Sequence, residues 1–142
     1  MGEDAAHEVL RDFDAVFLGP GLGIDTRLGI PGESGPGVVG AVEWIERMKL
    51  GPAELDAIHA VGAPGGELRA VVIGGGNTAL DAARELAGLG VRSVSMLYRR
   101  TTRDMSGYAH EMEHARLAGV VLVERAVPVR FMRDGKGALV GV

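Results

Sequence analysis

Residues 70–81 read AVVIGGGNTALD, an apolar run that meets three glycines and then the start of a helical pattern. A short apolar run rich in β-branched residues, bounded by glycines, is typical of a buried strand. A glycine turn between such a strand and a helix is the usual beginning of a dinucleotide-binding βαβ unit. These residues decide the fold class that the rest of the chain must fit.

The three glycines meet the demands of a phosphate-binding turn. Gly74 stands where the chain turns sharply out of the strand, and Gly76 where backbone approaches a pyrophosphate without an intervening Cβ, with Gly75 between them. Ala79 takes the third small position, where the helix packs closely on the strand. The pattern is therefore G-x-G-x-x-A.

The residues after the turn complete the unit. Residues 77–89 carry apolar side chains at three- and four-residue spacing, and residues 91–98 (VRSVSMLY) favour a second strand. The backbone N–H groups of Asn77 and Thr78 are expected to face a diphosphate at the helix N-terminus. Strand, glycine turn, helix and strand within roughly 30 residues predict dinucleotide binding, the alternative being a tight turn without a ligand.

The end of the second predicted strand favours NADP(H). NAD sites place an acidic residue here to accept a hydrogen bond from the ribose 2′-OH, but this chain has Arg99 and Arg100. Guanidinium groups bind phosphate with a fork of donors, which suits a 2′-phosphate, and Arg103 lies just beyond. Because neighbouring side chains of an extended segment point to opposite sides, the alternative is that one or both arginines are solvated charges.

The rest of the pattern predicts an α/β fold: a Rossmann-like, three-layer domain with a parallel sheet plus a β-hairpin or meander. Trp44 is expected in the core. The other predicted elements are a first strand at 13–18, a helix at 38–50, a helix at 107–117, a third nucleotide-unit strand at 120–123, and a hairpin of 127–132 and 138–142 around the turn at 134–137.

Composition excludes several classes of protein. At 142 residues the chain is expected to form one domain, and its net charge of −4 gives no reason to expect nucleic acid binding. The chain has no Cys, which excludes disulfide scaffolds, Cys-ligated metal clusters and a redox Cys pair. Without a run of about 18 apolar residues or a signal peptide, no membrane association is expected and the cytoplasm is the default location.

A competing motif lies at residues 110–114, where HEMEH matches the H-E-x-x-H pattern of zinc hydrolases. A catalytic zinc needs a third protein ligand, yet no further His follows, and Glu124 lies at the predicted third strand, where it is poorly placed to bind the same ion. The favoured interpretation is the polar face of an amphipathic helix that turns Met112 and Ala115 inward. We therefore predict no metal site here.

The chain contains, in this order, FDAVFLG at 13–19, GIPGE at 29–33, VVIGGGNTALD at 71–81, LYRR at 97–100, and residues 111–120. In these segments and their order it resembles the NADPH-binding region of the glutamate synthase small (β) subunit, within the FAD-dependent pyridine nucleotide-disulfide oxidoreductase superfamily. Dihydropyrimidine dehydrogenase has a similar module. The chain departs from the family pattern at Asn77, where Asp is common, and at Ser106, where Pro is common.

The resemblance implies an NADPH-dependent FAD oxidoreductase in which NADPH reduces FAD, and the electrons pass on to iron–sulfur clusters. The flavin-binding segments of the family lie before the equivalent of Phe13 and after that of Val142. We therefore expect an excised or truncated domain that binds NADPH, lacks catalytic residues and is inactive alone. FAD and iron–sulfur clusters are expected only in missing domains or partners, which are the parent's FAD-binding domain and a glutamate synthase large subunit or other electron acceptor.

Within the chain, residues 1–35 are expected to be a crossover segment from the flavin domain, and residues 36–142 the NADPH-binding domain. Two alternatives stay open. One is a stand-alone dinucleotide-binding or regulatory module without chemistry, and the other is a Rossmann-type enzyme that uses NAD or S-adenosylmethionine.

Overall fold

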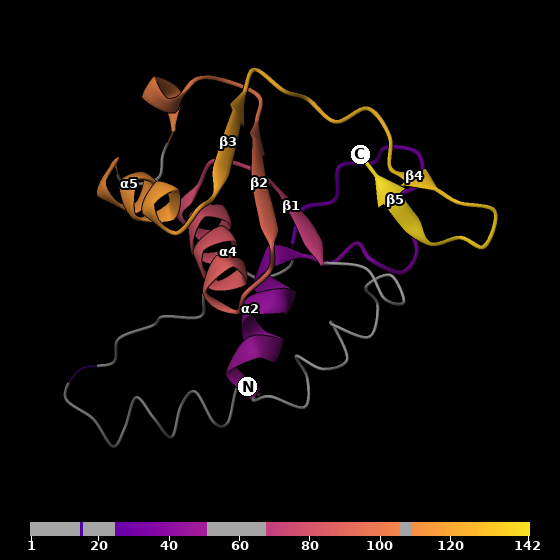
Figure 1. Ribbon diagram of the computed structural model, residues 1–142, viewed down its shortest axis with the longest axis horizontal. Helices are drawn as coiled ribbons and strands as arrows, with labels where there is room; N and C mark the ends of the chain where they lie inside the picture. The colour runs from indigo at the N-terminus through magenta and orange to yellow at the C-terminus, as the bar shows by residue number, and fades with distance from the viewer. Residues whose placement is uncertain (1–14, 16–24, 51–67, 106–108) are drawn as a thin grey trace.

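The computed structural model describes residues 15, 25–50, 68–105 and 109–142, and its centre is a three-stranded parallel sheet. The strands β1 (Arg69–Ile73), β2 (Ser93–Tyr98) and β3 (Val121–Glu124) lie side by side in this order (Figure 1). The register pairs Val72 with Met96, and Tyr98 with Glu124. The predicted parallel α/β sheet is thereby confirmed, while the strand predicted at 13–18 lies, apart from residue 15, outside the described residues.

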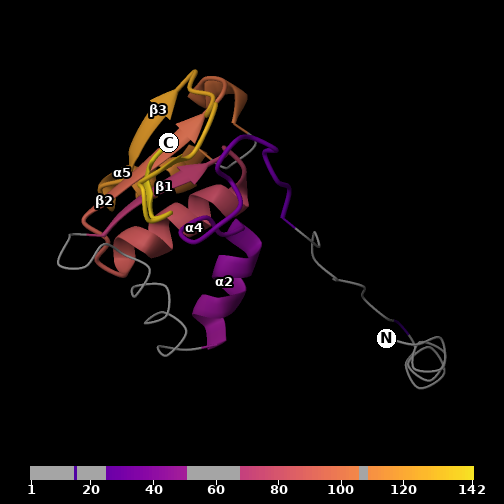
Figure 2. The same cartoon turned by 90° about the vertical axis from the view of Figure 1, so that its right-hand side faces the viewer.

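Helices α4 (Asn77–Gly88) and α5 (Ala109–Leu117) pack beside each other on one side of the sheet (Figures 1 and 2). Leu80 and Met96 are fully buried between α4 and β2, and Met112 and Ala115 of α5 join the same core. Arg84 of α4 also forms an ion pair with Glu111 of α5. The helices lie within two residues of their predicted bounds because both end at glycine turns, Gly90 and Gly119, with positive φ.

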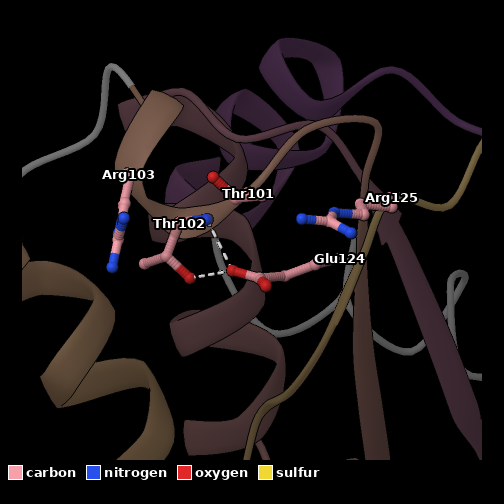
Figure 3. Close-up of a pocket in the computed structure, with 5 residues that line it drawn as sticks. All are labelled: Thr101, Thr102, Arg103, Glu124 and Arg125. Atoms are coloured by element: carbon pink, nitrogen blue, oxygen red, sulfur yellow. Dashed lines mark hydrogen bonds between the residues drawn. The ribbon is translucent and has the colours of Figure 1, made fainter.

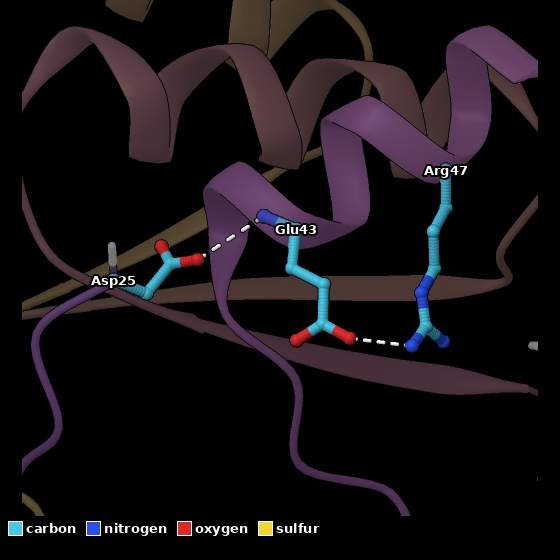
Figure 4. Close-up of polar contacts among 3 residues, drawn as sticks. All are labelled: Asp25, Glu43 and Arg47. Atoms are coloured by element: carbon cyan, nitrogen blue, oxygen red, sulfur yellow. Dashed lines mark hydrogen bonds and ion pairs between the residues drawn. The ribbon is translucent and has the colours of Figure 1, made fainter. Parts of the chain in front are cut away.

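Helix α2 (Ala41–Leu50) contacts α4, and its Trp44 is buried as predicted. The helix begins three residues later than the apolar pattern indicated, because its N-terminus is capped from a distant loop (Figure 4). Asp25 accepts hydrogen bonds from the backbone N–H groups of Val42 (2.9 Å) and Glu43 (3.1 Å). Val39, which falls within the predicted helix, therefore precedes the observed one and is exposed.

An antiparallel hairpin of β4 (Met132–Arg133) and β5 (Leu139–Gly141) follows the parallel sheet. The turn prediction is confirmed, since the Asp134 carboxylate accepts from the backbone N–H groups of Lys136 and Ala138, both at 2.9 Å. The first strand begins at Met132 rather than at residue 127. Pro128, which has no N–H to donate to a ladder, lies in the part that is not strand.

Arg133 attaches the hairpin to the loop at residues 28–37. Its guanidinium donates to the carbonyls of Gly32 (2.9 Å), Pro36 (2.7 Å) and Gly137 (2.9 Å). The Phe131 N–H also donates to the Pro31 carbonyl at 2.8 Å. Segments about a hundred residues apart in the sequence are therefore held together by backbone carbonyls that accept hydrogen bonds.

Candidate dinucleotide site

The glycine turn lies between the carboxyl end of β1 and the N-terminus of α4, as the sequence predicted. Gly74 has φ +142, and its N–H donates to the Leu97 carbonyl of β2 at 3.0 Å. A Cβ on Gly74 would lie 3.2 Å from that of Ala79, so strand and helix approach closely at the two small positions of the fingerprint.

The N-terminus of α4 offers backbone donors. The N-cap is Gly76, which has no side chain to cap the helix, and its carbonyl accepts the first helical hydrogen bonds, from Ala79 and Leu80. The N–H groups of Asn77 and Thr78 come before the first donors of the helix and so have no acceptor within it. The first turn contains no acidic residue. Asn77 is exposed and Thr78 half-buried. This arrangement fits a bound diphosphate.

Gly75 has a role that the sequence did not reveal. It is buried, and a Cβ at this position would lie 2.4 Å from Cε2 of Tyr98. Tyr98 is the last residue of β2, and its hydroxyl donates to the Asp104 carbonyl at 2.8 Å. Tyr98 therefore contacts both the glycine turn and the turn that follows β2.

The segment after β2 forms the short 3-10 helix η1 (Thr102–Asp104), which begins with a capping box. The Asp104 carboxylate accepts from the Thr101 hydroxyl (2.7 Å) and N–H (3.1 Å). These hydrogen bonds, the hydroxyl first, lower the pKa of Asp104 from its ordinary value of 3.8, and the charges of Arg100 and Arg125 act in the same direction.

Glu124, at the end of β3, approaches the same turn (Figure 3). Its Oε1 accepts hydrogen bonds from the hydroxyl of Thr102 and from its N–H, the latter at 2.5 Å. The hydroxyl contact, followed by the N–H contact, lowers the pKa of Glu124 from its ordinary value of 4.5, and the charges of Arg125 and Arg116 add to this. The parallel register placed this acid next to Tyr98.

Arg99 and Arg100 lie at the predicted position, immediately after β2, and both side chains are exposed. The glycine turn and this basic segment thus share the carboxyl edge of the sheet, where ligands of parallel α/β folds bind. Sequence reasoning considered Glu124 only as a zinc ligand and missed that Glu124 and Arg125 lie at this edge, since a residue at the end of β3 reaches it only through strand pairing. The sequence feature that could have revealed them is their position directly after the third apolar run, at residues 120–123.

The H-E-x-x-H segment lies on α5. Glu111 forms an ion pair with Arg84, and the rings of His110 and His114 lie 6.0 Å apart in a T-shaped arrangement. Met112 and Ala115 face the core, as the amphipathic interpretation predicted. No cluster of three or more potential metal ligands occurs within residues 25–50, 68–105 and 109–142.

A family model described as pyridine nucleotide-disulphide oxidoreductase matches residues 4–140. The chain belongs to this family. Membership agrees with a parallel sheet that carries a glycine turn at its carboxyl edge. Among the described residues of this family member, no helix has the length and apolar character that crossing a membrane requires.

Curated relatives of this oxidoreductase family member include glutamate synthase small chains and a formate dehydrogenase subunit. The glutamate synthase [NADPH] small chain of Halomonas elongata is 38% identical over 144 residues, which cover 96% of this chain and 29% of the relative. The chain of the same name from Escherichia coli is 33% identical, covering 95% of this chain and 29% of the relative. The NADP(+)-dependent formate dehydrogenase subunit beta of Moorella thermoacetica is 34% identical, covering 100% and 19%. The chain spans less than a third of these relatives.

Solved structures of oxidoreductases share the fold. A ferredoxin reductase from Rhodopseudomonas palustris matches with a TM-score of 0.54 and 15% identity, over 82% of this chain and 30% of that one. An FAD-dependent pyridine nucleotide-disulphide oxidoreductase from Desulfovibrio vulgaris matches with a TM-score of 0.51 and 19% identity, over 81% and 28%. At these identities the likeness concerns the fold alone.

Proposed function

We propose that this chain is the NADPH-binding part of a glutamate synthase small subunit-like oxidoreductase and holds NADPH for hydride transfer to FAD. The observation that carries the proposal is the shared carboxyl edge: a glycine turn with helix N-terminal donors at β1 and an exposed arginine pair at β2. The names of two relatives, which include NADPH, support the choice of nucleotide.

In this proposal the pyrophosphate lies against Gly74, Gly75 and Gly76, with the N–H groups of Asn77 and Thr78 as donors. Arg99 and Arg100 bind the 2′-phosphate through charge-assisted hydrogen bonds. NADPH supplies the hydride, and the residues of this chain orient the nucleotide and determine which nucleotide binds.

We further propose that residues 36–142 form the nucleotide domain and residues 1–35 the crossover from a flavin domain. The partners are then the FAD-binding domain of the parent protein and a glutamate synthase large subunit or another electron acceptor. FAD and iron–sulfur clusters belong to those parts, and the cytoplasm is the proposed location. The chain alone is proposed to perform no turnover, because a hydride acceptor belongs to the flavin domain.

Calorimetric titration of the 142-residue chain with NADPH and NADH tests the nucleotide assignment. We expect tighter binding of NADPH, and Arg99→Ala or Arg100→Ala to weaken it by roughly tenfold or more while NADH binding changes little. Arg69→Ala is the matched control, because this exposed arginine begins β1 at the opposite edge of the sheet. If both variants kept the full preference for NADPH, the 2′-phosphate assignment would be wrong.

The same titration with S-adenosylmethionine and with zinc addresses the other ligand classes. Each ligand that binds the native state also raises the melting temperature by mass action. We expect NADPH to cause the largest rise in the melting temperature. A larger shift with S-adenosylmethionine would replace the proposed function by that of another Rossmann-type enzyme.

A further inference from the structure

A pocket opens between the turn after β2 and the carboxyl end of β3 (Figure 3). Its volume is about 490 Å³, and it is lined by Thr101, Thr102, Arg103, Glu124 and Arg125. Arg103 and Arg125 lie on either side of the contact between Thr102 and Glu124 (Figure 3). Its first lining residue, Thr101, directly follows Arg99 and Arg100 in the sequence. The pocket therefore lies at the edge of the sheet where the nucleotide is proposed to bind.

Arg125 has an unusual backbone conformation. Its φ is +54, and among the described residues other than glycine it alone has a positive φ. Two hydrogen bonds hold the backbone there: Arg125 N–H to the Arg100 carbonyl and Ala126 N–H to the Tyr98 carbonyl, both at 3.0 Å. Such a conformation is uncommon in a residue other than glycine, and strained backbone conformations cluster at functional sites.

Around the pocket, the acidic side chains have hydrogen-bond partners within the protein, whereas the basic side chains have no ion-pair partner among the described residues. Both carboxylates already accept two hydrogen bonds from the turn, Asp104 from Thr101 and Glu124 from Thr102. Among the residues that the structure describes, neither Arg103 nor Arg125 takes part in an ion pair. The exposed guanidinium groups therefore keep donors for an anion, whereas the acids are engaged within the turn.

We propose that Arg125 is a specificity-determining residue that binds the nucleotide 2′-phosphate from the β3 side, opposite Arg99 and Arg100. This inference rests on the proposed function. The hydrogen bond between the backbones of Arg125 and Arg100 keeps the two sides of the phosphate site at a fixed separation. A guanidinium fork suits the 2′-phosphate, and an unphosphorylated ribose offers it no anion.

The test compares NADPH and NADH binding by calorimetry for the unmodified chain and for Arg125→Asn. Asn tolerates the left-handed conformation at this position, so the variant removes the guanidinium with little effect on the backbone. We expect NADPH affinity to fall about tenfold with NADH affinity within about twofold, as for loss of one charge-assisted bond. Arg125→Lys is expected to keep part of the preference, since a point charge replaces the fork.

Two further variants make the outcome decisive. Arg69→Asn removes the same charge at the opposite edge of the sheet and is expected to leave the NADPH-to-NADH ratio unchanged. If thermal denaturation shows that Arg125→Asn is not folded, Arg125→Gly repeats the test, because Gly adopts φ +54 most readily.

The role of Arg125 would be overturned if Arg125→Asn or Arg125→Gly left the ratio of NADPH affinity to NADH affinity unchanged while Arg99→Ala or Arg100→Ala reduced it. The proposed function would then still stand. Absence of NADPH binding by the unmodified chain would instead overturn the proposed function, and this inference with it.

Discussion

The ring of Tyr98 occupies the space that a side chain on Gly75 would need. The nearest ring atom lies 2.4 Å from the position of a Cβ on Gly75, and the Tyr98 hydroxyl is held by the Asp104 carbonyl. Gly75, the middle glycine of the turn, is therefore required by packing within the protein, whereas Gly74, the first, has a positive φ.

Gly75→Ala is expected to destabilise the protein by about 1–3 kcal/mol, because the methyl group displaces a ring that is anchored at both ends. The free energy of unfolding in urea measures the effect. Gly88→Ala is the control: a Cβ there meets nothing within 4 Å, and Ala in a helix is expected to stabilise by roughly 0.5–1 kcal/mol. Equal effects of the two variants would contradict the packing argument, and Tyr98→Ala should reduce the cost of Gly75→Ala in a double variant.

Asp25→Ala is expected to destabilise the protein by about 0.5–2 kcal/mol, because two N–H groups at the start of α2 lose their acceptor. Asp25→Asn keeps one side-chain oxygen and is expected to cost less. Urea unfolding and helical circular dichroism report the change, with Glu46→Ala on the exposed face of the same helix as control. A loss no larger than that of Glu46→Ala would show that the cap contributes little to stability.

The stability of the turn after β2 is expected to depend on pH through Glu124. Because folding lowers the pKa of this carboxyl, its contribution is present above the ordinary value of 4.5 and is lost as the pH falls below it toward the folded pKa. We expect Glu124→Gln to lower the melting temperature at neutral pH, with a difference from the unmodified chain that narrows below about pH 4.5. Asp104 contributes in the same direction.

Glu85→Gln on α4 controls for the loss of one negative charge, since no hydrogen bond or ion pair to another described residue holds that carboxylate. A difference between Glu124→Gln and the unmodified chain that stayed constant between about pH 3 and pH 7 would show that the contact with Thr102 acts without the charge.

Local patterns predicted the fold well because strand, turn and helix signals lie within a few residues of each other. The stretch at 70–81 contains the strand, the turn and the first turn of α4, and each boundary has a local chemical reason. The contacts missed by the sequence pair residues far apart. Asp25 caps a helix 17 residues away, and Glu124 contacts Thr102 across 22 residues. Such contacts depend on loop paths and strand register, which no short motif specifies.

The position of Tyr98 has a consequence for the thermodynamics of ligand binding. Its ring lies against one turn and its hydroxyl is bonded to the other, so the spacing between the glycine turn and the turn after β2 is set in the absence of ligand. A nucleotide that spans both turns would meet a preorganised frame, and little conformational entropy would be lost there on association. Cutting the hydroxyl contact with Tyr98→Phe would then reduce affinity through the entropy of binding, even though the side chain donates nothing to the ligand.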